Sequence, residues 1–215
     1  YPLAVGLTRY VGEWVAIVAA EDAYIAEDAL ELIEVEYEPL KAVVDPEAAF
    51  TDTEHLVHPS HGSNVLYHGN FLWGPVEEDF AKADDSLSLR TRWGRSATVP
   101  IETFGVLASW NEGTEILDVW ASIQMPNYVE LMASTLGYPL NSIRLNQDVD
   151  VGGSYGVKRG IKQSVLAGFL SRKLRQPVRL IEDRLTNMAG GDAQGPDRIF
   201  DTEVAFNKDG VIRSI

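Results

Sequence analysis

A glycine-rich stretch, DVGGSYGVKRG, occupies residues 150–160 and separates an alternating apolar segment from a long helical pattern. Such a turn lets backbone N–H groups approach an anionic ligand, and the amino end of a following helix adds a favourable dipole. The glycines fit neither the dinucleotide fingerprint G-x-G-x-x-G nor the phosphate-binding loop G-x-x-x-x-G-K-S/T. Taken alone, the stretch is more often a tight structural turn than a ligand site, and both interpretations stay open.

Two further polar side chains lie at places where chemistry is possible. Gln124, in the strand-to-helix corner ASIQMPN, can donate an amide hydrogen bond to an oxo or phosphate group. A lone glutamine there more often caps the following helix. Glu102, in VPIETFG, could have a raised pKa among apolar neighbours and act as a base, although a hydrogen-bonded structural carboxylate is commoner.

All four histidines lie in one polar segment, EHLVHPSHGSNVLYHGN, with the spacing H-x2-H-x2-H-x6-H. Zinc sites usually place their ligands on structured elements and in matching pairs, and neither cysteines nor a second cluster support such a site here. We therefore expect solvated imidazoles and no metal bound directly by side chains of this chain.

Composition narrows the classes of partner. The chain has 215 residues, with 32 Asp and Glu against 18 Lys and Arg, and this acidity disfavours nucleic acid and anionic membranes as partners. No apolar run is long enough to span a bilayer. The absence of cysteine excludes a disulfide, a thiol nucleophile and a cysteine-bound iron–sulfur cluster in this chain, and is compatible with a cytoplasmic location.

Periodicity predicts an α+β fold with hairpins and crossovers. The helix expected after the glycines has an apolar face made of Val165, Leu166, Phe169, Leu170 and Leu174. A polar loop is expected over 184–197. Helices are expected at 23–35, 45–50, 76–84, 124–139 and 157–175; single strands at 10–22, 33–40, 85–94, 141–150 and 176–183; and hairpins at 104–122 and 198–215.

Several segments together resemble one known family. RYVGEWVAIVAAEDAYIAEDALELIEVEYEPLKAVVDPEAAF resembles the second half of the hammerhead-like domain of molybdenum hydroxylase large subunits, the xanthine oxidase and aerobic carbon monoxide dehydrogenase family. LVHPSHGSN resembles the linker that follows it. ASIQMPN, DVGGSYGVK and RQPVRLIEDR resemble the start of the molybdopterin-binding region, in the same order. The carbon monoxide dehydrogenase branch looks closest, and the resemblance covers essentially the whole chain.

The resemblance implies a domain order: a partial hammerhead-like α/β domain at 1–50, a linker at 51–75, and the first part of a molybdopterin-binding domain, with mixed sheets and helices, at 76–215. It also implies a cofactor, a molybdenum–molybdopterin, often as the cytosine dinucleotide in bacteria. The matching site residues are Gln124, near the metal's oxo ligand, and the loop of Gly152, Gly153, Ser154, Tyr155 and Gly156. In that loop Ser154 replaces a family glycine and Tyr155 a family phenylalanine.

The family also implies partners: an iron–sulfur subunit with 2Fe-2S clusters, an FAD subunit, the remainder of the large subunit and a small-molecule substrate. Its catalytic glutamate would lie beyond residue 215, so we expect these residues to be part of a longer subunit and inactive alone. The leading hypothesis is a part of a molybdenum-dependent oxidoreductase that uses water as oxygen source. The alternative is a non-catalytic assembly or binding module that keeps the fold without cofactor. An unrelated phosphate-binding enzyme would leave the other matching segments unexplained.

Overall fold

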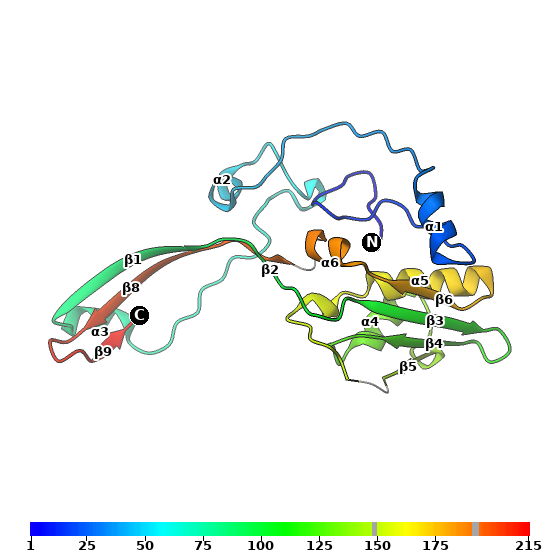
Figure 1. The fold of residues 1–215 in the computed structure, drawn as a ribbon. Helices are drawn as coiled ribbons and strands as arrows, with labels where there is room; N and C mark the ends of the chain where they lie inside the picture. Colours follow the sequence, from blue (N-terminus) through cyan, green and yellow to red (C-terminus); the bar gives the residue numbers. More distant parts are fainter. Residues whose placement is uncertain (148–149, 191–193) are drawn as a thin grey trace. The chain divides into compact units, whose positions relative to one another are not determined.

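The computed structural model describes residues 1–147, 150–190 and 194–215, and Figure 1 draws its fold. The chain forms two compact units. The first comprises Tyr1–Tyr37 and Ala97–Gly195, and the second comprises Glu38–Ser96 and Pro196–Ile215. The short strands β2 (Ser96–Ala97) and β7 (Gln194–Gly195) pair with each other.

The first unit is built on a four-stranded sheet with the order β5-β4-β3-β6. β3 and β4 form the predicted antiparallel hairpin, β6 pairs antiparallel with β3, and β5 pairs parallel with β4. The parallel pair is joined through α4, so β4, α4 and β5 form a crossover unit. The mixed α+β layout predicted from periodicity is confirmed. The bounds are β3 Gly105–Asn111, β4 Ile116–Ala121, β5 Ile143–Asn146, β6 Val178–Ile181 and α4 Tyr128–Leu136.

α5 (Lys162–Leu174) packs with α4 against this sheet, as Figure 1 shows. Its buried face consists largely of small residues, namely Ser164, Ala167, Gly168 and Ser171. The helix lies so close to the sheet that a Cβ on Gly168 would be 2.8 Å from the Leu117 side chain. The predicted apolar face is therefore wrong in part: Val165 and Leu166 are buried, but Phe169 and Leu174 are about half exposed. Large side chains cannot enter where the helix lies this close to the sheet.

The start of α5 also differs from the prediction of a helix over 157–175. A 3-10 turn, η3 (Val157–Arg159), comes first, and Gly160 is extended before α5 begins at Lys162. The interruption coincides with a lysine, Lys158, whose side chain is fully buried.

The polar loop predicted at 184–197 is wrong in part as well. Residues Arg184–Ala189 form α6, because the Asp183 side chain accepts a hydrogen bond from the Thr186 N–H group and caps the helix.

The first 37 residues contain one helix, α1 (Ala23–Leu30), and the side chain of Asp22 caps it by accepting a hydrogen bond from the Ile25 N–H group. The strands expected at 10–22 and 33–40 are wrong, because neither segment forms a ladder with another described segment. Their side chains, such as Val15 and Val35, are correspondingly exposed rather than buried. At the Gly12 turn the backbone lies so close to Gly190 that a Cβ on Gly12 would be 2.7 Å from its Cα.

The second unit is built on a three-stranded antiparallel sheet with the order β1-β8-β9, and its longest ladder is the ribbon of β1 and β8. β1 (Asp85–Trp93) pairs antiparallel with β8 (Arg198–Phe206) over nine residue pairs, and β9 (Ile212–Ser214) follows β8 after the predicted turn, in which Gly210 has φ 84°. α3 (Val76–Lys82) packs on β9 and β8. The remaining elements are α2 (Pro46–Thr51), which is capped by the Asp45 side chain, and η1 (Pro59–His61); η2 (Leu140–Ser142) belongs to the first unit.

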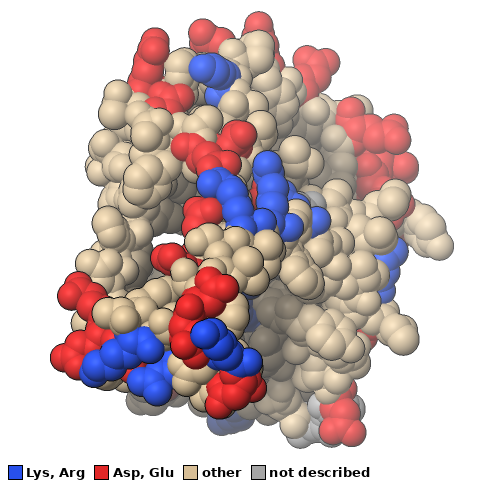
Figure 2. All heavy atoms as spheres, turned by 90° about the vertical axis from the view of Figure 1, so that its left-hand side faces the viewer, with Lys and Arg blue, Asp and Glu red and all other residues tan. Residues whose placement is uncertain are grey.

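The ribbon has two different faces. Directly paired residues of an antiparallel ladder share a face, and Leu87 pairs with Val204 while Thr91 pairs with Phe200. The opposite face is charged: Arg90 forms ion pairs with Glu47 and with Asp201. On the face of the molecule drawn in Figure 2, basic side chains are interspersed with acidic ones rather than gathered into one basic field. In the described part of the chain no helix is long and apolar enough to cross a membrane.

Candidate functional site

The glycine loop follows β5 and is held in a compact turn by its own glycines. Gly153 and Gly156 have φ of 88° and 100°, a region that residues with a side chain rarely adopt. Tyr155 also has a positive φ, 51°, and its side chain is largely exposed. Ser154 has no positive φ, so a side chain at this position fits the turn without strain.

The backbone of this loop keeps donors available. The N–H of Gly153 donates to the Val151 carbonyl at 2.9 Å, and that of Val157 donates to the Ser154 carbonyl at 3.0 Å. Within the ranges that the structure describes, the N–H groups of Ser154 and Tyr155 donate to no acceptor. They can therefore bind an oxygen atom of a ligand. The part of the prediction that adds the amino end of the following helix is wrong, because η3 and Gly160 separate the loop from the first turn of α5.

Gln124 lies beside this loop with a fixed orientation. Its Oε1 accepts from the N–H groups of Gly156 at 3.1 Å and of Lys158 at 3.2 Å. The backbone N–H of Gln124 donates to the backbone carbonyl of Lys158 at 3.1 Å. Because both side-chain partners are backbone donors, the amide must turn its oxygen to the loop, which leaves the NH2 group for another acceptor. The capping interpretation of Gln124 is wrong: α4 has Asn127 at its N-cap, and no side chain caps it.

Glu102, which precedes the loop by 50 residues in the sequence, also contacts it. Its Oε2 accepts from the Gly152 N–H at 2.7 Å and the Ser122 hydroxyl at 2.7 Å, and it forms an ion pair with the Lys158 ammonium group. Burial alone would raise the pKa of Glu102, but the hydrogen bonds from Lys158, Ser122 and Gly152 outweigh it, and the net pKa is lowered. Glu102 is therefore a hydrogen-bonded carboxylate, and the idea of a base with raised pKa is wrong.

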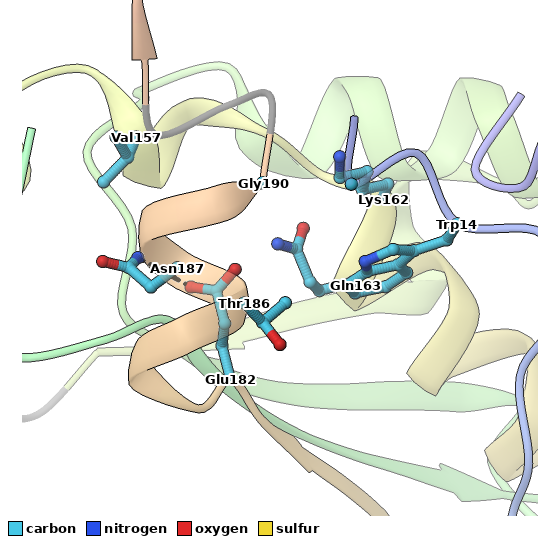
Figure 3. A pocket seen from close by; sticks show the side chains of 9 residues that line it. Trp14, Val157, Lys162, Gln163, Glu182, Thr186, Asn187 and Gly190 are labelled. Atoms are coloured by element: carbon cyan, nitrogen blue, oxygen red, sulfur yellow. Dashed lines mark hydrogen bonds between the residues drawn. The ribbon is translucent and has the colours of Figure 1, made fainter. Parts of the chain in front are cut away.

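A small hollow adjoins the loop and is shown in Figure 3. Gln163 extends into the space between α6 and Trp14, and its buried Oε1 has no hydrogen-bond partner in the described part of the chain. The volume, about 10 Å³, has room for about one water molecule. The hollow is too small for an organic substrate, and a water there would satisfy Gln163.

The histidine segment makes local contacts of its own. His55 contacts Asp52 through Nδ1 at 3.0 Å, and the His61 ring contacts the Val65 carbonyl at 3.2 Å. The pKa of Asp52 falls to about 2 because the N–H groups of His55 and Glu54 donate to it. Over residues 1–147, 150–190 and 194–215, no three His, Cys, Asp or Glu side chains are grouped as metal ligands.

The structure thus brings Gln124 and the glycine loop together, as the resemblance implies. Sequence reasoning missed Lys158 and Ser122, which complete the polar network with Glu102. A signal was present for the lysine, since Gly-x-Lys follows the glycines directly, but its burial depends on a carboxylate 56 positions earlier in the chain.

Comparison with known families bears on what this arrangement binds. A family model described as the molybdopterin cofactor-binding domain matches residues 57–215. The chain belongs to this family. Residues 1–41 match a second model, the a/b hammerhead domain of aldehyde oxidase and xanthine dehydrogenase. The two matches confirm the resemblance to molybdenum hydroxylase large subunits and the fold class inferred from it.

Individual relatives agree with the family assignment. The chain is 32% identical over 98% of its length to the 6-hydroxypseudooxynicotine dehydrogenase complex subunit gamma of Paenarthrobacter nicotinovorans, and 32% identical over 92% to the carbon monoxide dehydrogenase large chain of Hydrogenophaga pseudoflava. It covers 26% of each relative. A crystal structure of quinoline 2-oxidoreductase from Pseudomonas putida 86 matches with a TM-score of 0.81 and 34% identity, over 98% of this chain and 27% of that one. The chain therefore spans about a quarter of the length of these relatives.

The residues of the site fit a molybdopterin-type cofactor. The exposed turn offers the unpaired N–H groups of Ser154 and Tyr155, and the NH2 group of Gln124 has no acceptor among the described residues. All of these are donors, which suits a ligand whose nearest atoms are oxygens.

Proposed function

We propose that this chain supplies the oxo-facing part of a molybdenum-cofactor subunit, in an oxidoreductase that oxidises a small-molecule substrate with water as oxygen source. The observation that carries the proposal is the orientation of Gln124. Two backbone donors hold its oxygen, so its NH2 group is fixed as a hydrogen-bond donor next to the glycine loop. Membership of the cofactor-binding family supports the identity of the ligand.

The roles of the residues follow from their hydrogen-bonding groups. Gln124 and the backbone N–H groups of Ser154 and Tyr155 would hold the oxo group of the cofactor. Gly152, Gly153 and Gly156 would let the backbone approach it without side chains in the way. Donors fixed in advance stabilise negative charge that develops on an oxygen, because they need no reorganisation during the reaction. When bound, the cofactor would supply the redox chemistry.

The partners are part of the same proposal. The relatives are named as subunits of complexes, such as a complex subunit gamma and a large chain. Because this chain has no cysteine, 2Fe-2S clusters would be held by an iron–sulfur subunit, and FAD by a further subunit. The remainder of a large subunit would contribute the general base. We further propose the cytosine dinucleotide form of the cofactor, a cytoplasmic location, and the domain division 1–50, 51–75 and 76–215.

The first experiment measures molybdenum by mass spectrometry in protein purified from its natural host, and identifies the chains that co-purify. Molybdenum together with flavin and iron–sulfur partners supports an oxidoreductase. Metal-free protein without such partners would contradict it and favour the non-catalytic assembly module.

The second experiment replaces Gln124 in that complex. Gln124→Ala should lower the turnover rate by about 10²–10³-fold, the usual loss on removing one preorganised donor, while molybdenum content is retained. Asn127→Ala is a matched control, because this neighbouring exposed residue makes no capping hydrogen bond. Equal turnover in both variants would exclude the donor role of Gln124.

A further inference from the structure

Lys158 is the one lysine or arginine among the described residues whose side chain is fully buried. A buried ammonium group is strongly unfavourable unless it is paired and hydrogen-bonded. Its charge partner is Glu102, whose side chain is 41% exposed. In some proteins a pair of this kind fixes a geometry that an apolar pair of similar size would not fix.

The two residues tie both ends of the glycine loop to one carboxylate. Glu102 accepts from the N–H of Gly152, at the start of the loop, and from the ammonium group of Lys158, just after its end. The Glu102 N–H also donates to the Gly152 carbonyl at 3.3 Å. The approach is so close that a Cβ on Gly152 would lie 2.6 Å from the Cβ of Glu102.

The same lysine connects the carboxylate to Gln124. The backbone of Lys158 makes two hydrogen bonds with Gln124, one as donor to Oε1 and one as acceptor from its N–H. A displacement of Lys158 would therefore move the group that fixes the direction of the Gln124 amide.

From these contacts we infer that Glu102 and Lys158 are positioning residues: their ion pair, in which only the lysine is buried, holds the loop 152–158 and the Gln124 amide in the geometry that faces the cofactor. The part concerning the cofactor rests on the proposed function. The part concerning the loop rests only on the hydrogen bonds that Glu102 and Lys158 make, so the two parts can be tested separately.

The loop is tested by hydrogen–deuterium exchange on the purified complex, comparing Lys158→Met with the wild type. Met keeps a long unbranched side chain and leaves Glu102 able to reach water. We expect the amides of 156–160 to exchange at least about tenfold faster, with little change in β3 and α4. Met132→Ala, in the core of α4, is the matched control, because it should loosen the first unit without singling out the loop. Unchanged exchange of 156–160 in Lys158→Met would overturn the inference.

A double variant separates positioning from simple charge balance. Glu102→Gln combined with Lys158→Met removes both charges, and the new amide oxygen can still accept from Gly152 and Ser122. We expect thermal stability to recover relative to Glu102→Gln alone, while 156–160 stays fast-exchanging because the lysine tie is absent. Recovery of slow exchange in the double variant would show that the pair serves charge balance only.

The cofactor part is tested on the same preparations by electron paramagnetic resonance of Mo(V), with molybdenum content measured in parallel. Lys158→Met should alter the Mo(V) spectrum at unchanged molybdenum content, and Met132→Ala should not. Faster exchange of the loop together with an unaltered Mo(V) spectrum would contradict the claim that the ion pair positions groups that face the metal. Absence of molybdenum from the wild type would instead contradict the proposed function, and the exchange experiment would still decide whether the pair positions the loop.

Discussion

Antiparallel pairing joins β3 to β4 and β6 in the first unit and β1 to β8 in the second, yet the two regions bury very different amounts of apolar surface. In β3 and β4 alternate side chains are buried under α4 and α5, and Leu117 is completely enclosed. In the ribbon Leu87 is 58% exposed, because the unit's helix α3 packs on β8 and β9. Small sheets need a hydrophobic face or packing against a helix to be stable. The two regions therefore differ in how far helices cover their strands, more than in how the strands pair.

The largest expected difference in the free energy of unfolding comes from shortening one leucine side chain to alanine in each region. Leu117→Ala should lower the free energy of unfolding by about 2–5 kcal/mol, because it leaves a cavity between the sheet and α5. Leu87→Ala, its match on the ribbon, should cost less than about 1 kcal/mol, since this leucine is already largely in water. Urea unfolding of both variants measures the difference, and equal losses would mean that the ribbon is covered in solution.

The second comparison adds volume instead of removing it. Gly168→Val should destabilise the protein by about 1–3 kcal/mol, because even its Cβ would lie 2.8 Å from Leu117 Cδ2 in a closed core. A Cβ on Gly94 would meet no atom within 4 Å, so Gly94→Val should be close to neutral. Thermal unfolding of the two variants is the measurement. A neutral Gly168→Val would show that α5 can move away from the sheet.

The third comparison uses one helix cap from each unit. Asp183→Ala should cost about 1 kcal/mol, because α6 contributes the buried Asn187. Asp45→Ala should cost less, since α2 buries no residue and can fray freely. Unfolding in urea at pH 7 gives both values, and a larger loss for Asp45→Ala would reverse the expected order.

The Asp183 cap also predicts a pH dependence. Its pKa is lowered because the Thr186 N–H and hydroxyl groups donate to it. A carboxyl whose folded pKa lies below its unfolded value stabilises the fold above that unfolded value, about 3.9, and the stabilisation is lost as pH falls through the folded pKa. Stability should therefore fall less steeply below about pH 4 in Asp183→Ala than in the wild type, and identical slopes would contradict this role.

The smallest effect is expected on the charged face of the ribbon. Arg92→Met removes an exposed ion pair with Asp197 and should change the free energy of unfolding by less than about 1 kcal/mol. The effect should shrink further in about 1 M salt, because exposed charges are screened. Unfolding at low and high salt tests this. A large, salt-independent loss would show that the pair is enclosed by something outside the ribbon.

Local patterns in the sequence predict the elements that carry their own signal. The β3–β4 hairpin, the capped helix α2 and the β8–β9 turn at Gly210 each follow from nearby residues. The strands at 10–22 and 33–40 could not be judged locally, because a strand needs a partner elsewhere in the chain. The buried face of α5 was misjudged for a related reason: a stripe of small residues has little hydrophobic signal, and its value depends on the sheet beneath it.

The candidate site likewise has one part that the sequence predicts and one part that only the structure shows. Glycines and a corner glutamine can be recognised from residue types, and family resemblance relates them to one ligand. The contacts that hold them, from Glu102 and Ser122 to Gly152 and Lys158, join residues 20 to 56 positions apart. No periodicity reports such pairings, so the reason why Lys158 is buried is visible only in three dimensions.

The close approach of Glu102 to Gly152 has a consequence for engineering and for natural variation. A bulkier residue at 152 collides with Glu102, and a shift of Glu102 removes the acceptor of the Gly152 N–H. The two positions, 50 residues apart, should therefore change together or not at all. Anyone transplanting this loop into a related subunit should move it with its carboxylate, because the turn and the glutamate are a single transferable part.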